Sequence, residues 1–317
     1  GETVDLCVVG AGLSGLATAY FWRQRRPKAR ILVLDAHADF GGHAQRNEFV
    51  VDCRTLVSYG GSESLQSPAT LWDDVAKDLI RDLGVDLGRF DTAFDRSLYP
   101  SLGLSRGVFF SREAFGEDKL VTGDPMRMVA DDIPPDRMNA RSAAAFVGDF
   151  PLPADMRAKL VEVYESTRDP LAGRSLEEKE KLLEHTTYRD WLINVWGLDE
   201  RTADAFYGRT LDFFAAATDA VSAREAFYTG YPGFAGLGVA RDADAIKEME
   251  EPYVHHFPDG NASLARLIVR RLVPGVAPGT TMDDIVTARF DYDKLDVAGA
   301  PTRIRLDSTA VVVRNRD

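Results

Sequence analysis

The chain has 317 residues, of which 45% are hydrophobic and 28% are charged, and its formal net charge is −12. That length can bury a substantial core and suggests about two domains. The acidic balance excludes a nucleic-acid partner, which would need a basic face, and it could attract a cationic substrate. The only cysteines, Cys7 and Cys53, are too few for a disulfide framework or a metal-ligand cluster, so no metal site is expected.

The N-terminal segments predict one βαβ unit. Thr3–Val9 is mostly apolar and β-branched, which indicates a buried strand with Cys7 in the core. Apolar residues recur at helical spacing over Leu13–Arg25, and Ile31–Leu34 is a second apolar run. A strand, a helix and a strand in this order imply a parallel sheet, so the predicted fold class is α/β, of the Rossmann type.

The middle of the chain predicts a largely helical region inserted after this unit. Leu71 to Leu83 mark one face of an amphipathic helix that Gly84 ends, and Gly107–Phe110 is expected to be a short strand. Ser175 and Glu178 have the spacing of a capping box. Further helices are expected over Asp155–Ser166, Ser175–Glu184, Thr187–Trp196 and Glu200–Ala216.

The last third of the chain changes character again. Tyr228–Gly238 is rich in glycine and aromatic residues and is not expected to be a regular helix. Leu264–Leu272 predicts an amphipathic helix, and Thr302–Leu306 and Ala310–Val313 predict strands. The expected domain division is a βαβ unit with a following loop (residues 1–65), a helical substrate-domain region (66–250) and a return to the first domain (251–317).

The sequence GAGLSG follows the first predicted strand and opens the first predicted helix. Gly10 permits a tight turn, Gly12 lets the backbone approach a pyrophosphate, and Gly15 lets the helix pack closely on the strand. The helix N-terminus adds unpaired N–H groups and a positive dipole end. Asp35 ends the second strand, where a carboxylate can bind ribose hydroxyls and would repel a 2′-phosphate. Together these features predict a dinucleotide site that disfavours NADP.

The residues after the second strand favour FAD over NAD. NAD-binding domains usually continue into another βα unit, whereas this chain continues with Gly41, Gly42 and the basic residue His43, where a second loop can approach a diphosphate. A further pair, Gly60 and Gly61, gives a loop without bulky side chains, which a flat ring system can approach. The alternative interpretation is two ordinary turns.

These motifs belong to blocks with a more specific resemblance. The segments GAGLSGLATAY, LDAHADFGGHAQRNEF, YGGSES, YPGFAGLG and HFPDGNASLARLIVRRL resemble the spermidine dehydrogenases and, more loosely, the FAD-dependent amine and polyamine oxidase group. The resemblance runs from the first strand to the last residue. Members of this group are considerably longer, so the chain is similar to their N-terminal half and stops at Asp317, within an expected hairpin.

The resemblance implies a role in cofactor binding for particular residues. Asp35 would bind the adenosine ribose of FAD. His43 stands where relatives carry an arginine beside the diphosphate, so the sequence departs from the pattern of the family there. The implied FAD-binding residues are Gly10, Gly12, Gly15, Asp35, Gly41, Gly42, His43, Gly60, Gly61, Ser62, Ala310 and Val311.

The resemblance also implies an activity. A member of this group would oxidise a polyamine or another amine, such as spermidine, by hydride transfer to FAD, and water would hydrolyse the resulting imine. No catalytic residue is identified. Two alternatives stay open: an FAD-dependent, desaturase-like oxidoreductase acting on an apolar substrate, which predicts a long apolar tunnel, and a non-catalytic flavin-binding subunit.

Candidate substrate and haem residues are few. Glu63 could pair with a cationic amine or be a solvated loop carboxylate. Tyr228 and Tyr231 could contribute to an aromatic cage, although loop and core packing accounts for these tyrosines as well. The adjacent His255 and His256 could supply a base or a haem ligand, so haem b stays open beside FAD.

The expected partners are an amine substrate, an electron acceptor that is either oxygen or a redox protein, and a complementary C-terminal chain or fragment. The sequence itself assigns no compartment. Relatives suggest a periplasmic or membrane-associated location.

Overall fold

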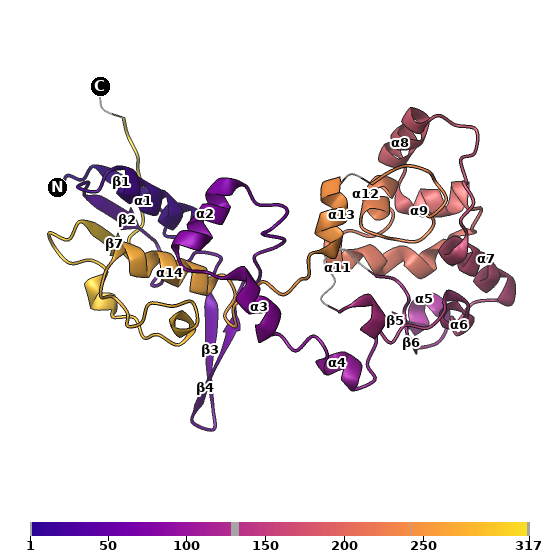
Figure 1. Ribbon diagram of the computed structural model, residues 1–317, viewed down its shortest axis with the longest axis horizontal. Coiled ribbons are helices and arrows are strands. Elements are labelled where there is room, and N and C mark those ends of the chain that lie inside the picture. The colour runs from indigo at the N-terminus through magenta and orange to yellow at the C-terminus, as the bar shows by residue number, and fades with distance from the viewer. Residues whose placement is uncertain (1, 128–132, 242, 316–317) are drawn as a thin grey trace. The chain divides into compact units, whose positions relative to one another are not determined.

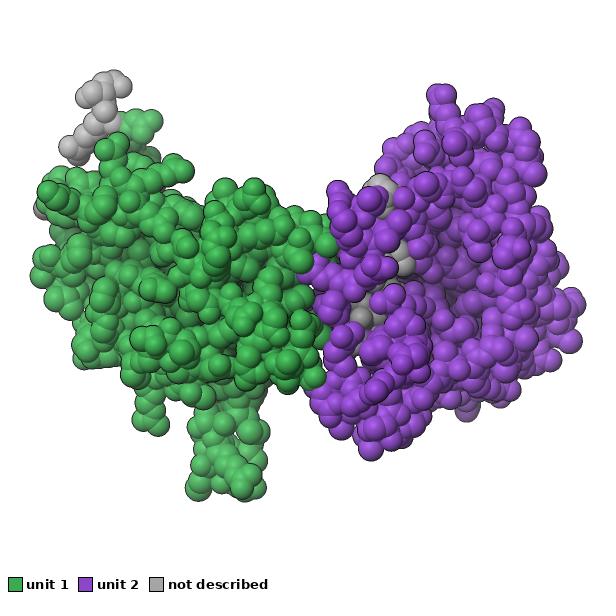
Figure 2. Space-filling view, viewed as in Figure 1, with its two compact units in different colours: residues 1–94, 254–317 green, residues 95–253 purple. Residues whose placement is uncertain are grey.

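The structure is a computed structural model that describes residues 2–127, 133–241 and 243–315. The chain divides into two compact units, drawn in different colours in Figure 2. Unit 1 combines residues 1–94 with residues 254–317, and unit 2 consists of residues 95–253. The expected end of the chain at Asp317 lies outside the described residues. None of the helices in the described part of the chain is both long and apolar enough to cross a membrane.

Unit 1 is built on a parallel three-stranded sheet. Strand β1 (Leu6–Val9) pairs with β2 (Ile31–Leu34), and β2 pairs with β7 (Thr302–Arg305), both in parallel. Helix α1 (Leu13–Arg25) connects β1 to β2, as expected from the sequence. The predicted fold class is therefore confirmed: a Rossmann-type domain with a parallel sheet, combined with a largely helical insertion (Figure 1).

The insertion supplies most of the helices in the described residues. In unit 1 the remaining elements are the hairpin strands β3 (Arg46–Val51) and β4 (Arg54–Tyr59), helices α2 (Asp74–Asp82), α3 (Leu87–Ala93) and α14 (Ala262–Leu272), and the 3₁₀ turns Asp284–Val286 and Tyr292–Lys294. Unit 2 contains strands β5 (Gly107–Phe110) and β6 (Lys119–Thr122), and helices α4 (Leu98–Ser101), α5 (Arg112–Phe115), α6 (Ala143–Gly148), α7 (Ala154–Glu165), α8 (Leu176–His185), α9 (Tyr188–Asp190), α10 (Glu200–Ala203), α11 (Leu211–Phe214), α12 (Ala223–Tyr228) and α13 (Ala243–Glu250).

The core of unit 1 joins residues from both ends of the chain. Val8 and Leu16 belong to the same buried cluster as Leu267 of α14, and α14 packs against α1. Ile80 of α2 and Phe90 of α3 lie in this cluster too. Residues 66–94 are therefore part of unit 1, because their apolar face is buried there, and the boundary expected near residue 65 falls inside this unit.

Strand β1 differs from the expected buried strand. Val8 is buried, but Cys7 is exposed and Val9 is 58% exposed. The expectation of a core thiol at Cys7 is wrong because β1 is an edge strand, and alternate side chains of a strand point to opposite faces. Helices α1 and α14 cover the face that carries Val8.

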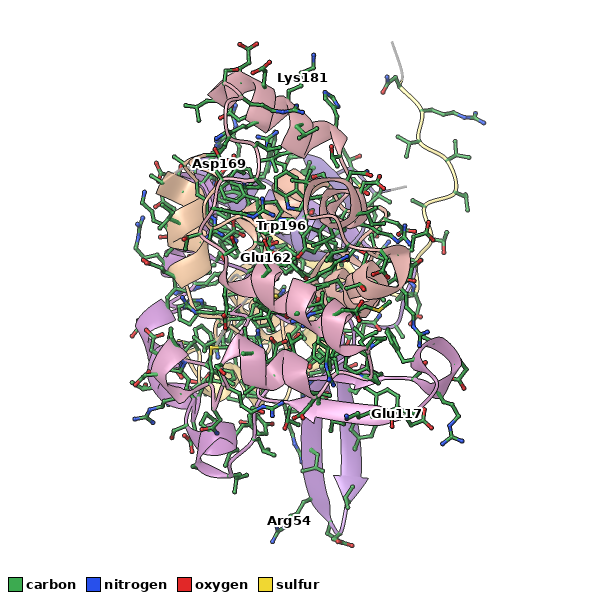
Figure 3. All side chains as sticks on the ribbon, turned by 90° about the vertical axis from the view of Figure 1, so that its right-hand side faces the viewer. Arg54, Glu117, Glu162, Asp169, Lys181 and Trp196 are labelled. Atoms are coloured by element: carbon green, nitrogen blue, oxygen red, sulfur yellow. The ribbon has the colours of Figure 1, made fainter. Side chains whose placement is uncertain are left out.

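The β3–β4 hairpin was not predicted. It is antiparallel, with Arg46 opposite Tyr59 and Val51 opposite Arg54, and Arg54 lies at its far end (Figure 3). Apolar side chains of both strands are exposed, among them Phe49 at 53% and Leu56 at 52%. Such an exposed pair of strands is only marginally stable by itself, so contacts at its base hold it in place.

Unit 2 packs around aromatic side chains. Trp191 and Tyr188 are fully buried, and each stacks on Phe234 from the glycine-rich segment. The capping box of Ser175 and Glu178 at the start of α8 is confirmed. The single helix expected over Glu200–Ala216 is instead three short helical pieces: α10, a 3₁₀ segment over Asp204–Thr210, and α11, which ends before Ala215, where φ is +51°.

The strand expected at Ala310–Val313 is absent from the described residues. No strand is assigned after Arg305, and Val311 is 86% exposed. The chain beyond β7 has no neighbouring strand in the described part of unit 1 to complete its hydrogen bonds, so the apolar run alone does not make a strand.

The close packing of α1 on β1 gives a direct test. A Cβ atom at Gly15 would lie 1.9 Å from the carbonyl oxygen of Gly10, which is backbone and cannot rotate away. We expect Gly15→Ala to lower the free energy of unfolding of unit 1 by about 2–3 kcal/mol, the upper part of the range for over-packed sites. Urea unfolding followed by circular dichroism measures this.

Gly88→Ala is the matched control, because Gly88 also lies in a helix of unit 1 and an added Cβ meets nothing closer than 3.4 Å there. It should leave stability unchanged or raise it by about 0.4–1 kcal/mol. Equal effects of the two substitutions would show that the close contact at Gly15 does not limit the packing.

Candidate dinucleotide site

The first loop of the site joins β1 to α1. Gly10 has a φ of +102°, which favours glycine, and its N–H donates to the carbonyl of Leu34 at 2.7 Å. Gly12 is the N-cap residue of α1, with no side-chain cap, and the first turn carries no acidic residue. The helix N-terminus is thus left with uncapped N–H groups and no negative charge, which suits an anion.

The second glycine pair lies against this first loop. Gly41 forms a parallel bridge with Gly12, and its N–H donates to the carbonyl of Ala11 at 2.8 Å. Gly42 has a φ of +61°, and a Cβ there would come within 3.0 Å of the Cα of Gly12. The loop between β1 and α1 and the loop after β2 therefore lie against each other. Together they form a cradle of main chain without bulky side chains.

Asp35 holds the first loop from the end of β2. Its carboxylate accepts from the N–H of Ala11 at 2.6 Å and from the N–H of His37 at 2.9 Å, and it lies 3.0 Å from His37 Nδ1. Burial disfavours the charged form of Asp35, but the donors from His37 and Ala11 outweigh it and hold its pKa below the ordinary value. Asp35 therefore orders the loop in addition to any contact with a ribose.

The predicted flavin loop is joined to the second glycine pair. The N–H of Ser62 donates to the carbonyl of His43 at 3.2 Å, and a Cβ at Gly61 would lie 2.3 Å from that same oxygen. At Gly60 an added Cβ would lie 3.3 Å from the carbonyl of Gln45. The side chain of His43 is exposed. The structure thus brings Gly60, Gly61 and Ser62 to the cradle.

Asn261 completes this loop and was not identified from the sequence as a site residue. Its Nδ2 donates to Ser62 Oγ at 2.7 Å and to the carbonyl of Ser64 at 3.0 Å, and its main-chain N–H donates to the carbonyl of Ser62 at 3.0 Å. Its Oδ1 is buried without a hydrogen-bond partner. A buried acceptor without a donor costs free energy, so this oxygen is available to a ligand. The block HFPDGNASLARL was the signal that could have found it.

A buried ion pair fixes the base of the hairpin to the same segment. Arg46 Nη1 lies 3.2 Å from Asp259 Oδ2, and Ser263 Oγ donates to Asp259 Oδ1 at 2.6 Å. Asp259 is fully buried. Burial alone would lower the pKa of Arg46, but its bonds to Glu48 and Asp259 raise it overall, so the guanidinium stays charged.

Ala310 and Val311 do not join the cradle. The chain after β7 contacts the end of β2 through Asp307, whose N–H donates to the carbonyl of His37 at 2.9 Å, and Ser308, whose N–H donates to the carbonyl of Asp35 at 2.7 Å. Beyond these bonds the side chain of Val311 is exposed. The contact with adenine that the resemblance implies for these two residues stays a prediction.

The candidate substrate residues fall in different units. Glu63 belongs to unit 1, whereas Tyr228 and Tyr231 belong to unit 2. Tyr231 is 2% exposed and its hydroxyl donates to the carbonyl of Arg209 at 2.7 Å. Tyr228 lies beside Arg224, with the guanidinium carbon 5.5 Å from the ring centre. The two tyrosines therefore have structural contacts of their own within unit 2.

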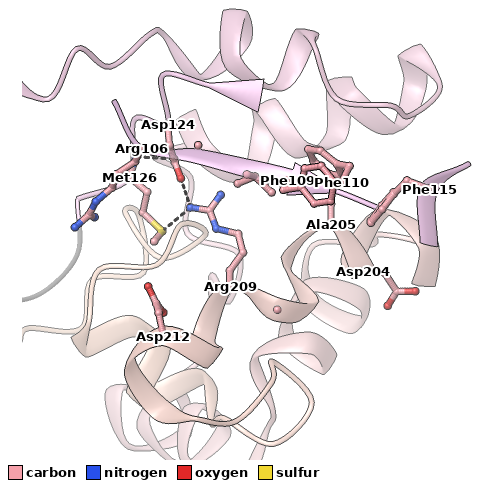
Figure 4. Close-up of a pocket in the computed structure, with 13 residues that line it drawn as sticks. Arg106, Phe109, Phe110, Phe115, Asp124, Met126, Asp204, Ala205, Arg209 and Asp212 are labelled. Carbon is pink, nitrogen blue, oxygen red and sulfur yellow. Dashed lines mark hydrogen bonds and ion pairs between the residues drawn. The ribbon is translucent and has the colours of Figure 1, made fainter. Parts of the chain in front are cut away.

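Unit 2 contains a cavity with acidic and aromatic side chains (Figure 4). Its volume is about 480 Å³, and Phe109, Asp204 and Asp212 line it. Arg209 donates to Asp124 and lies within 3.5 Å of the sulfur of Met126. Arg209 pairs with Asp124, and Asp204 pairs with Arg189 at 3.2 Å, so the exposed carboxylate of Asp212, the lining residue Arg106 and the exposed ring of Phe109 give the cavity its character.

The adjacent histidines contact aromatic rings. The ring of His255 lies 6.0 Å from that of Phe90, and the ring of His256 lies 4.5 Å from that of Phe94. Among the residues that the structure describes, no group of three or more His, Cys, Asp or Glu side chains is placed to hold a metal ion.

Comparison with known proteins identifies the first domain. Residues 8–79 match the family described as NAD(P)-binding Rossmann-like domain. No curated protein matches the chain.

Similar solved structures include putrescine oxidase bound to putrescine, at 18% identity and a TM-score of 0.38, covering 84% of this chain and 49% of that one. A putative protoporphyrinogen oxidase from Exiguobacterium sp. 255-15 is 15% identical with a TM-score of 0.40, covering 98% of this chain and 54% of that one. The chain thus spans about half the length of these proteins. Similarity at this level assigns no activity.

The contacts of Asp35 predict a pH dependence. Its pKa is lower in the folded chain than the value of about 3.9 expected when unfolded. Its stabilising contribution is therefore complete above about pH 4 and is lost as the pH falls through the folded pKa. We expect Asp35→Asn to cost about 1–3 kcal/mol at pH 7, because the amide cannot accept all of the donors. This cost should shrink steadily below pH 4.

Urea unfolding at pH 7, 5, 4 and 3 measures this difference. Asp91→Asn, at an exposed carboxylate on α3, is the control and should track the unsubstituted chain at each pH. A cost of Asp35→Asn that does not vary with pH would contradict the assigned role of the charge.

Proposed function

We propose that this chain carries the FAD-binding part of an FAD-dependent amine oxidoreductase. The observation that carries the proposal is the backbone cradle formed by Gly12, Gly41 and Gly42 at the uncapped N-terminus of α1. After β2 the chain continues into this second loop and the β3–β4 hairpin, with no further βα unit, which favours FAD over NAD.

The residues of the cradle fit this cofactor. Gly12 and Gly42 would let the diphosphate approach the main chain, and the N–H groups of the first turn of α1 would face its charge. Asp35 would offer a lone pair to a ribose hydroxyl while it keeps the bond to Ala11. Asn261 Oδ1 would accept a hydrogen bond at the loop of Ser62. When bound, FAD would accept a hydride from the carbon beside the substrate nitrogen, and water would hydrolyse the imine.

The substrate class within this proposal is an amine, with a polyamine such as spermidine as the specific candidate. The net charge of −12 favours the approach of a polycation. The cavity in Figure 4 supports this class, because Asp212 can attract an ammonium group and Phe109 can face it. Oxygen or a redox protein would accept the electrons afterwards.

A complementary chain or segment is part of the proposal. The β3–β4 hairpin exposes Phe49, Val50 and Leu56, and neither strand has a second neighbour in the described residues. Exposed apolar strands with open edges invite pairing with another strand. A second polypeptide that copurifies with the chain and protects these side chains from solvent would support this part of the proposal.

An absorption spectrum tests the central proposal. We expect the purified chain to show a two-band flavin spectrum that bleaches on anaerobic addition of spermidine. A Soret band in addition to the flavin bands would indicate bound haem b. A flavin spectrum that spermidine does not change would support FAD binding and contradict a polyamine substrate. A chain that takes up no FAD, alone or with its complementary segment, would contradict the proposal.

The cradle itself is tested by Gly42→Ala. The added Cβ would lie 3.0 Å from the Cα of Gly12 and would occupy the space between the loops, so we expect FAD affinity to fall about tenfold or more, which corresponds to about 1.4 kcal/mol. Gly275→Ala is the matched control: its φ of +83° imposes a similar backbone cost, but nothing lies within 4 Å. Titration of the unloaded chain with FAD, followed by flavin fluorescence, measures both variants. An equal loss of FAD affinity in both variants would show that the cradle does not contact FAD.

A further inference from the structure

A second cavity of unit 2 differs in charge from the one in Figure 4. Its volume is about 620 Å³, within the range of small-molecule sites. The glycine-rich segment Gly230–Gly238 forms one side, and Arg127 and Arg241 contribute positive charge. The described side chains that line it include no carboxylate. The described lining of this cavity is therefore positively charged, whereas the chain as a whole has a net charge of −12.

The side-chain polar groups of this cavity are hydrogen-bond donors. Tyr164 accepts a bond from Arg209 Nη1 at 3.1 Å, so the proton of its hydroxyl is left to donate. Burial raises the pKa of Tyr164 to about 12, so the hydroxyl keeps this proton at neutral pH. Arginine has donors only, and the guanidinium group of Arg127 adds to the same set.

Three main-chain carbonyls of the glycine-rich segment already accept hydrogen bonds from side chains. The carbonyl of Pro232 accepts from the hydroxyl of Tyr188 at 3.0 Å, and that of Gly233 accepts from Trp196 Nε1 at 3.0 Å. The carbonyl of Leu237 accepts from Lys179 Nζ at 2.8 Å. The carbonyls of Pro232 and Gly233, which line the cavity, are therefore engaged within unit 2, whereas the hydroxyl of Tyr164 and the guanidinium group of Arg127 can donate to a ligand.

Arg127 has a buried donor that a ligand could satisfy. Its Nε is buried and has no hydrogen-bond partner, which is costly for a charged group. Arg241 lies over the ring of Phe227, with its guanidinium carbon 5.2 Å from the ring centre. Together with Phe234, these side chains provide a planar donor and apolar walls in one cavity.

We propose that this cavity binds the carboxylate of a small organic acid that has an aromatic or aliphatic body. The planar guanidinium fork of Arg127 matches the two oxygens of a carboxylate, and Phe227, Tyr231 and Phe234 would enclose the apolar body. A polyamine has neither group and would meet the positive charge of Arg127. The proposal concerns unit 2 alone and does not rest on FAD binding.

Two probes of opposite charge on the same skeleton test the proposal. The purified chain is titrated at pH 7 with 4-phenylbutyrate and, separately, with 4-phenylbutylamine. Intrinsic tryptophan fluorescence is a suitable readout, because Trp191 and Trp196 pack beneath Gly233, where an added Cβ would lie 3.4 and 3.0 Å from their indole nitrogens. Isothermal titration calorimetry confirms the affinities. We expect the acid to bind at least tenfold more tightly than the amine.

Substitution of the arginine locates the binding. Arg127→Met keeps the length of the side chain and removes its donors, so we expect the affinity for 4-phenylbutyrate to fall about 10- to 100-fold, as for a lost charged hydrogen bond. Arg127→Lys keeps the charge and should retain part of the affinity. Arg112→Met is the matched control, because the Arg112 side chain is 71% exposed and pairs with Asp118 at the surface. It should leave the affinity unchanged within twofold.

The proposal is overturned if the amine binds as tightly as the acid, if neither probe binds saturably, or if Arg127→Met and Arg112→Met have the same affinity for the acid. The comparison of the two probes on the unsubstituted chain stands even if Arg127→Met does not fold.

Discussion

The short separation between α1 and the end of β1 is the constraint on which unit 1 depends. Gly15 lies so close to the carbonyl of Gly10 that no side chain fits between them. This approach sets the position of the helix N-terminus above the sheet, and Asp35 fixes the intervening loop through Ala11. Gly41 can then bridge to Gly12, and the cradle follows from backbone packing before any ligand is considered.

Charge is distributed unevenly in this acidic chain. In unit 1, Arg46 and Asp259 form a buried pair that connects the hairpin to the segment before α14. In unit 2, Arg209 and Asp124 form another, in the lining of a cavity that also carries the exposed carboxylate of Asp212. The cavity of Arg127 carries positive charge instead. Because buried pairs neutralise themselves, the side chains outside them decide which ligands each cavity attracts.

The sequence predicted those helices and strands whose bounds are set by neighbouring residues along the chain. Leu13–Arg25 and Ile31–Leu34 agree with the expected bounds because glycine, proline and apolar periodicity delimit them. The β3–β4 hairpin was missed because its apolar side chains are exposed, and the two strands lack the alternation of buried and exposed side chains that predicts a strand. In the site, the glycines were visible in sequence. The block HFPDGNASLARL pointed to the segment of Asn261, but its bond to Ser62 joins residues 199 positions apart, and the local pattern does not name that partner.

The division of unit 1 into two separate stretches of chain has a consequence for folding during synthesis. Unit 2 is continuous, so its core can close once residue 253 has left the ribosome. The core of unit 1 needs Leu267 of α14, and its sheet needs β7, so residues 1–94 must wait for the whole intervening unit to be translated. Since domains generally fold as units from the N-terminus onward, this chain inverts the usual order, and its first strands stay exposed to chaperones the longest.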